Sequence, residues 1–145
     1  RVLSLIERGR TEGGTVTTGG GTPSGVDRGF FVEPTVFAGI DNSATIAREE
    51  VFGPVLTVLR YDDVDDAIAL ANDSSYGLGG TVWTSDPDRG VDVARRVETG
   101  SFGVNYFNLD WGSPFGGVKA SGIGRELGPE GLAAYQNLKS IFLPA

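Results

Sequence analysis

The segment REEVFGPV, residues 48–55, contains the most distinctive set of reactive side chains in the chain. Glu49 and Glu50 are adjacent carboxylates, and an aromatic ring at Phe52 and the pair Gly53-Pro54 follow them. Carboxylates can accept hydrogen bonds or act as acids and bases. An isolated acid pair, however, is more often a solvated surface loop that leads into a buried strand. The surrounding sequence must therefore decide between the two interpretations.

Two residue types that do catalysis elsewhere are absent. The 145 residues include no cysteine and no histidine, so the chain has no thiol nucleophile and lacks the commonest general base. The same absence excludes disulfide bonds and zinc-thiolate sites. We therefore expect no catalytic residue and no metal ligand in this chain, and any reaction must use groups from elsewhere.

The charge of the chain excludes two classes of partner. The net charge is -7 and there is no basic run, which argues against nucleic acid and against anionic membranes. No apolar run approaches the roughly 20 residues that cross a bilayer. Because cysteine is absent, a reducing compartment fits, and we expect the cytoplasm.

The first residues predict a helix that is already under way. Val2, Leu5 and Ile6 have the i, i+3, i+4 spacing of an amphipathic helix, and no methionine or capping residue precedes them. We therefore expect a C-terminal piece of a longer protein, with the missing N-terminal part of the same chain as its first partner. An independent small domain is the alternative.

From residue 55 onward, strands and helices alternate. The pattern predicts three strands and two intervening helices, at 55–61, 62–72, 79–85, 86–100 and 101–105. With short connections, this order predicts a βαβαβ unit with parallel strands. Earlier, TVTT (15–18) predicts a short strand, and Pro34 limits the strand around it to an edge or a bend.

The segment 106–128, YFNLDWGSPFGGVKASGIGRELG, has no sustained periodicity. Such long loops inside compact domains are usually functional or disordered, and the aromatic content favours function. The loop follows the third strand, and ligands of parallel sheets bind at the carboxyl ends of strands. A last helix begins at Pro129, and LKSIFLP (138–144) predicts a strand that pairs with another sheet or subunit.

Several motifs together resemble one known family. EEVFGPV, NDSSYGLGGTVWTSD, GSFGVN, SPFGGVKASGIGRELGPEGLAAYQNLKSI and GFFVEPTVF stand in the order found in the C-terminal part of NAD(P)-dependent aldehyde dehydrogenases. The resemblance covers nearly the whole chain. It implies an α/β fold in which residues 1–137 form the C-terminal part of the thiol-bearing catalytic domain and residues 138–145 form an oligomerisation strand.

The resemblance assigns roles to two residues of the first segment. Glu50 resembles the glutamate that accepts hydrogen bonds from the nicotinamide ribose hydroxyls, for which two acceptor oxygens suit a vicinal diol. Phe52 resembles the aromatic residue that packs beside the nicotinamide and restricts its poses. The implied cofactor is NAD or NADP.

The resemblance also assigns substrate-binding roles to residues of the loop at 106–128. Phe115 resembles an aromatic residue of the substrate channel, whereas core packing is the commoner role of a lone Phe. Phe107, Leu109 and Trp111 correspond to a variable stretch that lines the channel mouth. Asp110 in that mouth favours a polar or cationic substrate, unless it is only a solvated acid.

Three further residues of this region are expected to be structural. Asn105 is predicted to hydrogen-bond at the end of its strand. Lys119 and Arg125 match family positions that we interpret as fixing the loop, with a contact between subunits as a further role.

The implied reaction oxidises an aldehyde to a carboxylic acid through a cysteine thiohemiacetal and hydride transfer to NAD(P)+. The cysteine and the base glutamate belong to the upstream part of the family pattern, so the chain alone is expected to be inactive. The expected assembly is a homodimer or homotetramer. The alternative is a non-catalytic relative that acts as a structural or oligomerising subunit. The residues present do not select the aldehyde, NAD over NADP, or the number of subunits.

Overall fold

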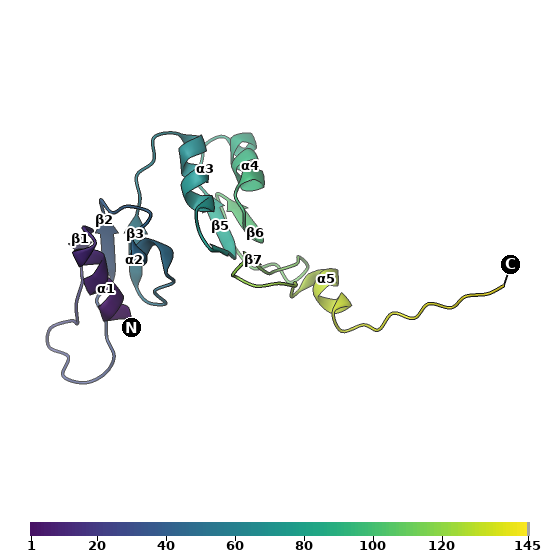
Figure 1. Ribbon diagram of the computed structural model, residues 1–145, viewed down its shortest axis with the longest axis horizontal. Coiled ribbons are helices and arrows are strands. Elements are labelled where there is room, and N and C mark those ends of the chain that lie inside the picture. Colours follow the sequence, from purple (N-terminus) through teal and green to yellow (C-terminus); the bar gives the residue numbers. More distant parts are fainter. Residues whose placement is uncertain (145) are drawn as a thin grey trace. The chain divides into compact units, whose positions relative to one another are not determined.

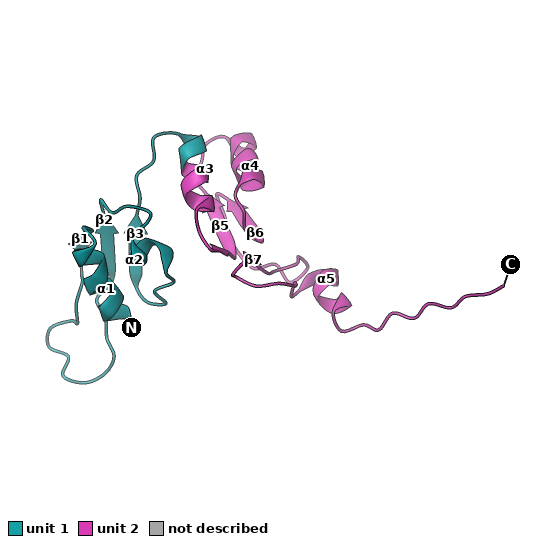
Figure 2. Cartoon of the chain, viewed as in Figure 1, with its two compact units in different colours: residues 1–66 teal, residues 67–145 magenta. Residues whose placement is uncertain are grey.

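The computed structural model describes residues 1–144. The chain divides into two compact units, Arg1–Asp66 and the residues from Ala67 onward (Figures 1 and 2). No helix of the described residues is long and apolar enough to cross a bilayer. Each unit is described by itself below.

The first unit is a three-stranded sheet with two helices. Its elements are α1 (Val2–Thr11), β1 (Thr15–Thr18), β2 (Thr35–Ala38), α2 (Thr45–Arg48) and β3 (Val55–Val58). The strand order is β1-β2-β3, in which β1 is antiparallel and β3 is parallel to β2. The segment between β1 and β2 is a long loop, which Figure 1 shows below the sheet.

The core of this unit forms where α1 packs on the sheet and on α2. Phe37 on β2 is fully buried, and Ile6, Ile40 and Ile46 belong to the same buried cluster. Gly9 permits this close approach, because a Cβ there would lie 3.0 Å from side-chain atoms of Phe37 and Ile46. The i, i+3, i+4 stripe of α1 therefore faces the core as the sequence predicts.

The second unit contains two small sheets. Its elements are α3 (Val64–Asn72, which begins in the first unit), β4 (Tyr76–Gly77), β5 (Gly79–Val82), α4 (Pro87–Arg96), β6 (Ser101–Val104), β7 (Val118–Lys119) and α5 (Gly128–Ala133). Strands β5 and β6 are parallel, and β4 and β7 are antiparallel. Helix α4 connects β5 to β6 and packs on both.

Helix α4 shows how local sequence sets an element. The Asp86 carboxylate accepts hydrogen bonds from the backbone N–H groups of Asp88 and Arg89, and Pro87 occupies the first turn. Arg95 and Arg96 lie in the last turn, where the helix dipole favours positive charge. The helix ends at Arg96, four residues before Gly100, because residues 97–100 turn back toward β6.

The α/β class is confirmed, as is the parallel pair β5 and β6 with its connecting helix. The strand at 55–58 exists, but it pairs with β2 and not with β5. Of the two alternatives for Pro34, an edge strand or a bend, the edge is wrong, since β2 is the central strand. Pro34 lies just outside β2, and the ladder begins when the N–H of Thr35 donates to Pro54 O at 2.8 Å.

Residues 136–144 form neither helix nor strand. Their large apolar side chains are exposed: Leu138, Ile141, Phe142 and Leu143 each expose between 76% and 97% of their surface. A strand requires a partner, so the expected oligomerisation strand stays a prediction.

Candidate functional site

The turn at residues 49–54, which contains Glu50 and Phe52, is held against the N-terminus of α1. The Arg1 guanidinium donates a hydrogen bond to the backbone oxygen of Glu50 at 2.6 Å and lies 4.0 Å from the Glu49 carboxylate. Gly53 lies so close to Val2 that a Cβ would approach its methyl groups to 2.8 Å. These contacts hold the backbone and leave the Glu50 side chain exposed, with no hydrogen bond or ion pair to another described residue.

Phe52 has a strained backbone. Its φ is +55°, in the left-handed region that bulky residues rarely adopt, and 83% of its surface is exposed. Such a conformation costs about 1–3 kcal/mol and is concentrated at ligand sites. The buried core does not explain this strain, because the ring does not enter it.

This turn can therefore bind a ligand that presents hydroxyl groups next to a flat ring. The Glu50 carboxylate supplies two acceptor oxygens with no competing protein donor among residues 1–144. The exposed Phe52 ring lies two residues away on the same turn. The residues present fit the cofactor contacts that the sequence suggested.

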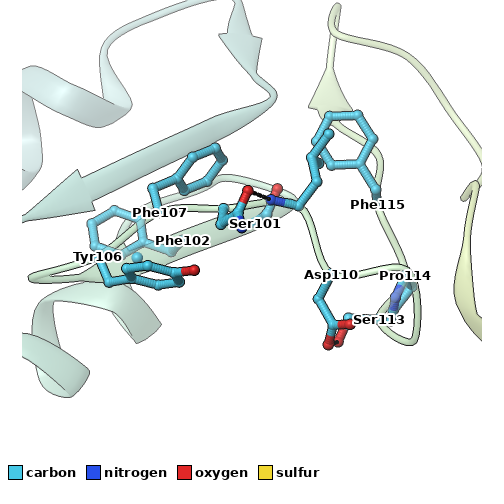
Figure 3. A pocket seen from close by; sticks show the side chains of 11 residues that line it. Ser101, Phe102, Tyr106, Phe107, Asp110, Ser113, Pro114 and Phe115 are labelled. Carbon is cyan, nitrogen blue, oxygen red and sulfur yellow. Dashed lines mark hydrogen bonds between the residues drawn. The ribbon is translucent and has the colours of Figure 1, made fainter.

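The second unit contains a cavity of about 210 Å³, which we call the aromatic pocket (Figure 3). It lies between β6 and the loop that follows this strand. Aromatic rings contribute much of its wall, and the lining residues are Ser101, Phe102, Gly103, Tyr106, Phe107, Asn108, Leu109, Asp110, Ser113, Pro114 and Phe115. In Figure 3, Phe102, Tyr106 and Phe107 gather on one side and Phe115 on the other.

The loop around Phe115 is fixed by backbone pairing. Phe115 and Glu126 exchange two N–H to O hydrogen bonds of 2.7 Å, which form an isolated antiparallel bridge. Arg125 donates to the backbone oxygens of Gly117 at 2.9 Å and Gly124 at 2.7 Å. Gly100 has no room for a side chain beside Gly116. These contacts therefore hold the loop, and with it Phe115, in one conformation beside the pocket.

Lys119 fixes the other end of the loop. Its ammonium group donates to the backbone oxygens of Asn72 at 2.7 Å and Ser74 at 3.2 Å, and it pairs with the Glu98 carboxylate at 2.6 Å. Asn72 is the last residue of α3, whose dipole favours a cation there. The predictions that Lys119 and Arg125 fix the loop are confirmed.

Asn105 also has the predicted role at the end of its strand. Its side-chain oxygen accepts from the Thr84 N–H at 2.7 Å, and its amide donates to Thr84 O at 2.7 Å. Its φ of +55° turns the chain from β6 into the pocket loop. Asparagine tolerates this conformation better than most residues.

Asp110 is the acidic residue of the pocket lining. Its carboxylate accepts from the Ser113 hydroxyl at 2.7 Å and from the Gly112 N–H at 3.0 Å. These hydrogen bonds, the Ser113 one first, lower the pKa of Asp110 below its usual 3.8, although partial desolvation opposes them. The group is therefore an anion at neutral pH.

The sequence model of the aldehyde dehydrogenase family matches residues 1–141. The chain belongs to the aldehyde dehydrogenase family. The crystal structure of Mycobacterium tuberculosis aldehyde dehydrogenase complexed with NAD+ superposes with a TM-score of 0.96 at 53% identity, over 99% of this chain and 30% of that one.

Two curated aldehyde dehydrogenases show the same extent of similarity. Geranial dehydrogenase of Castellaniella defragrans is 57% identical over 98% of this chain and 29% of its own length. Betaine aldehyde dehydrogenase of Brucella melitensis is 49% identical over 99% of this chain and 30% of its own length. The chain thus spans about 30% of the length of these aldehyde dehydrogenases.

The structure brings some, but not all, of the expected aldehyde dehydrogenase residues together. Phe107, Leu109 and Phe115 line one pocket, whereas Trp111 is absent from the lining and exposes 81% of its surface. Trp111 lies within the turn that Asp110 and Ser113 close. Glu50 and Phe52 belong to the first unit, so they are a separate part of the candidate site.

Two aromatic residues of the pocket, Phe102 and Tyr106, are not singled out by the sequence analysis. Phe102 lies inside β6 and Tyr106 directly follows Asn105. By its sequence, Phe102 is an ordinary strand residue. The alternation of side chains along a strand does not show which face of the sheet a later loop covers. Tyr106 opens the aromatic-rich loop, and its position at the carboxyl end of a parallel strand was the available signal.

Proposed function

We propose that this chain supplies the nicotinamide-side cofactor contacts and part of the substrate pocket of an NAD(P)-dependent aldehyde dehydrogenase. The substrate class is an aldehyde, which the enzyme oxidises to a carboxylic acid. The observation that supports this best is the turn at 49–54, where an exposed carboxylate without a partner among residues 1–144 adjoins a strained, exposed ring. The NAD+ complex of the M. tuberculosis relative supports the choice of cofactor.

On the cofactor side, Glu50 accepts hydrogen bonds from the two hydroxyls of the nicotinamide ribose, and Phe52 limits the poses of the ring. Neither residue takes part in bond making. NAD(P)+, when bound, supplies the acceptor for the hydride. Holding the sugar and the ring in one orientation lowers the entropic part of the activation barrier for hydride transfer, because the two reactants are already oriented for reaction.

On the substrate side, the aromatic pocket binds the body of the aldehyde and excludes water from it. A cysteine thiolate and a base glutamate complete the reaction through a thiohemiacetal. The cysteine must lie outside these 145 residues, which contain none. We therefore propose that the chain alone is inactive, and calorimetry with NAD+ should show no micromolar binding.

The same proposal assigns the two ends of the chain. Residues 1–137 belong to the thiol-bearing catalytic domain, and residues 138–145 include a strand that joins another sheet in a homodimer or homotetramer. The exposed apolar side chains of Ile141 and Phe142 support this assignment. The cytoplasm remains our predicted location.

A hybrid enzyme tests the function. In it, this chain replaces the matched 30% of the M. tuberculosis aldehyde dehydrogenase, and Glu50→Gln is compared with Glu49→Gln. Both variants remove one exposed carboxylate from the same turn. We expect Glu50→Gln to slow hydride transfer about tenfold or more, with a smaller effect on aldehyde capture, and Glu49→Gln to leave both steps nearly unchanged.

Single-turnover kinetics separate capture of the aldehyde from hydride transfer. An unchanged turnover number and cofactor KM in Glu50→Gln would remove the assignment of Glu50. A folded hybrid that binds NAD+ but oxidises no aldehyde would favour the non-catalytic alternative.

A further inference from the structure

The wall of the aromatic pocket has an uneven charge. Among the lining residues, Asp110 is the one acidic side chain, and no lysine or arginine lines the cavity. The Arg125 guanidinium donates hydrogen bonds to the backbone oxygens of Gly117 and Gly124. Four aromatic rings complete the wall, and ring faces carry partial negative charge. The pocket is thus favourable to positive charge and unfavourable to negative charge.

The position of the Asp110 carboxylate is fixed by its own turn. Gly112 N–H donates to Oδ1 at 3.0 Å, the Ser113 hydroxyl donates to Oδ2 at 2.7 Å, and Ser113 N–H donates to the Asp110 backbone oxygen at 3.1 Å. A carboxylate oxygen accepts more than one hydrogen bond, so these contacts do not exhaust it. The turn therefore holds a negative charge at the edge of the pocket, directed toward Ser113 (Figure 3).

We propose that Asp110 determines the charge selectivity of this pocket, which accepts cationic and uncharged aldehydes and rejects aldehydes that carry a carboxylate. This inference rests on the proposed function. An anionic substrate would bring a second negative charge beside the exposed Asp110 carboxylate, and like charges repel each other. A cationic substrate would gain both the carboxylate and the ring faces.

A purely structural role is the competing explanation, because Asp110 also closes the turn. Asparagine separates the two roles. Its side-chain oxygen can accept from Gly112 N–H, and its amide can donate to the Ser113 hydroxyl, which also accepts hydrogen bonds. Asp110→Asn therefore keeps both contacts of the turn and removes only the charge.

The test compares three benzaldehydes with different para substituents in the hybrid enzyme: a carboxylate, a methyl group and a trimethylammonium group. Each kcat/KM is divided by that of the methyl compound, and the ratios are compared between variants so that intrinsic reactivity cancels. We expect Asp110→Asn to raise the relative kcat/KM of the anion about tenfold and to lower that of the cation by a similar factor. Asp88→Asn, which removes a charge from the first turn of α4, is the matched control and should change neither ratio.

The outcomes are distinguishable from failure of the proposed function. Unchanged ratios in Asp110→Asn, in a hybrid that oxidises the methyl compound, would overturn the inference and leave the function intact. A hybrid that oxidises none of the three aldehydes counts against the function. In that case, ligand-observed NMR measures the affinity of the 145-residue chain for benzyltrimethylammonium, benzyl alcohol and benzoate, and these affinities decide the inference. The cation must bind more tightly than the anion, and Asp110→Asn must reduce that difference; otherwise the inference fails.

Discussion

The Lys119 ammonium group lies 2.6 Å from the Glu98 carboxylate and within hydrogen-bond distance of two backbone oxygens at the end of α3. One side chain thus joins β7, the end of α3 and the segment before β6. Lys119 itself has a φ of +56°, so it occupies this place despite backbone strain. The ion pair and the two hydrogen bonds oppose that strain and hold β7 in place.

Lys119→Met should loosen this loop locally. It removes the ion pair and both hydrogen bonds but keeps a long side chain. Hydrogen bonds from charged groups contribute about 1.5–3 kcal/mol, and the partial exposure of Glu98 reduces the share of the ion pair. We expect amide hydrogens of residues 116–124 to exchange about tenfold faster in the hybrid enzyme, measured by mass spectrometry. Lys139→Met, at an exposed position, is the control, and equal exchange in the two variants would contradict the role of Lys119.

Truncation of Phe37 should reduce the stability of the fold, whereas truncation of Phe52 should mainly weaken cofactor binding. Phe37→Ala empties the centre of the first unit and should cost about 3–5 kcal/mol of stability. Phe52→Gly removes an exposed ring and relieves the positive φ, which offsets the greater freedom of glycine in the unfolded chain. We expect its stability to change by less than about 1 kcal/mol, while the cofactor KM rises. Chemical denaturation and steady-state kinetics of the hybrid enzyme measure both effects, and a large loss of stability in Phe52→Gly would show that the ring is structural.

Glu12 should make the first unit sensitive to acid. Its carboxylate accepts from the Thr45 hydroxyl at 2.7 Å, from the Thr45 N–H at 2.6 Å and from Arg8 at 3.0 Å. The Thr45 hydroxyl is the largest cause that lowers the pKa of Glu12 below 4.5, and desolvation opposes it. A lowered pKa means that the ionised form stabilises the fold above the unfolded pKa. That stability is lost as the pH falls below about 4.5 and through the folded pKa.

The prediction for Glu12→Gln follows from this sign. The variant should be less stable than the parent at neutral pH, and the difference should shrink as the pH falls below 4.5. Glu7→Gln is the control, because the Glu7 carboxylate is exposed and pairs with Arg10 at 3.8 Å, without reaching α2. Denaturation midpoints between neutral pH and pH of about 3 measure the effect. A constant difference across this range would contradict the role of the Thr45 contacts.

The terminal segment should decide assembly. Ile141 and Phe142 expose 76% and 90% of their surface, and residues 136–144 have no strand partner within the described chain. Ile141→Asp together with Phe142→Asp should dissociate the hybrid enzyme into smaller species, as measured by light scattering after gel filtration. Lys139→Asp, on the same segment, should leave the mass unchanged. An unchanged mass in the double variant would remove the assignment of an oligomerisation strand.

Local sequence was a reliable guide wherever neighbouring residues set the structure. The helix predicted from residue 86 agrees with the start of α4 at Pro87, and Ile6 of the apolar stripe of α1 is buried. The parallel pair β5 and β6 followed from a short helical connection. The pairing of β3 with β2 was not predicted, because the neighbouring Pro34 suggested an edge or a bend and not a central strand.

The candidate site also has a part that local sequence sets and a part that only the tertiary structure sets. The sequence by itself determined that Glu50 and Phe52 lie close together, since only Val51 separates them along the chain. Only the tertiary structure decided that Phe52 is strained and exposed, and that Phe102 joins Phe115 in one pocket while Trp111 does not. The reason is physical. Spacing along the chain specifies which side chains a single helix, strand or turn presents together, whereas a cavity forms where distant segments close on one another through backbone contacts such as the pair Phe115 and Glu126.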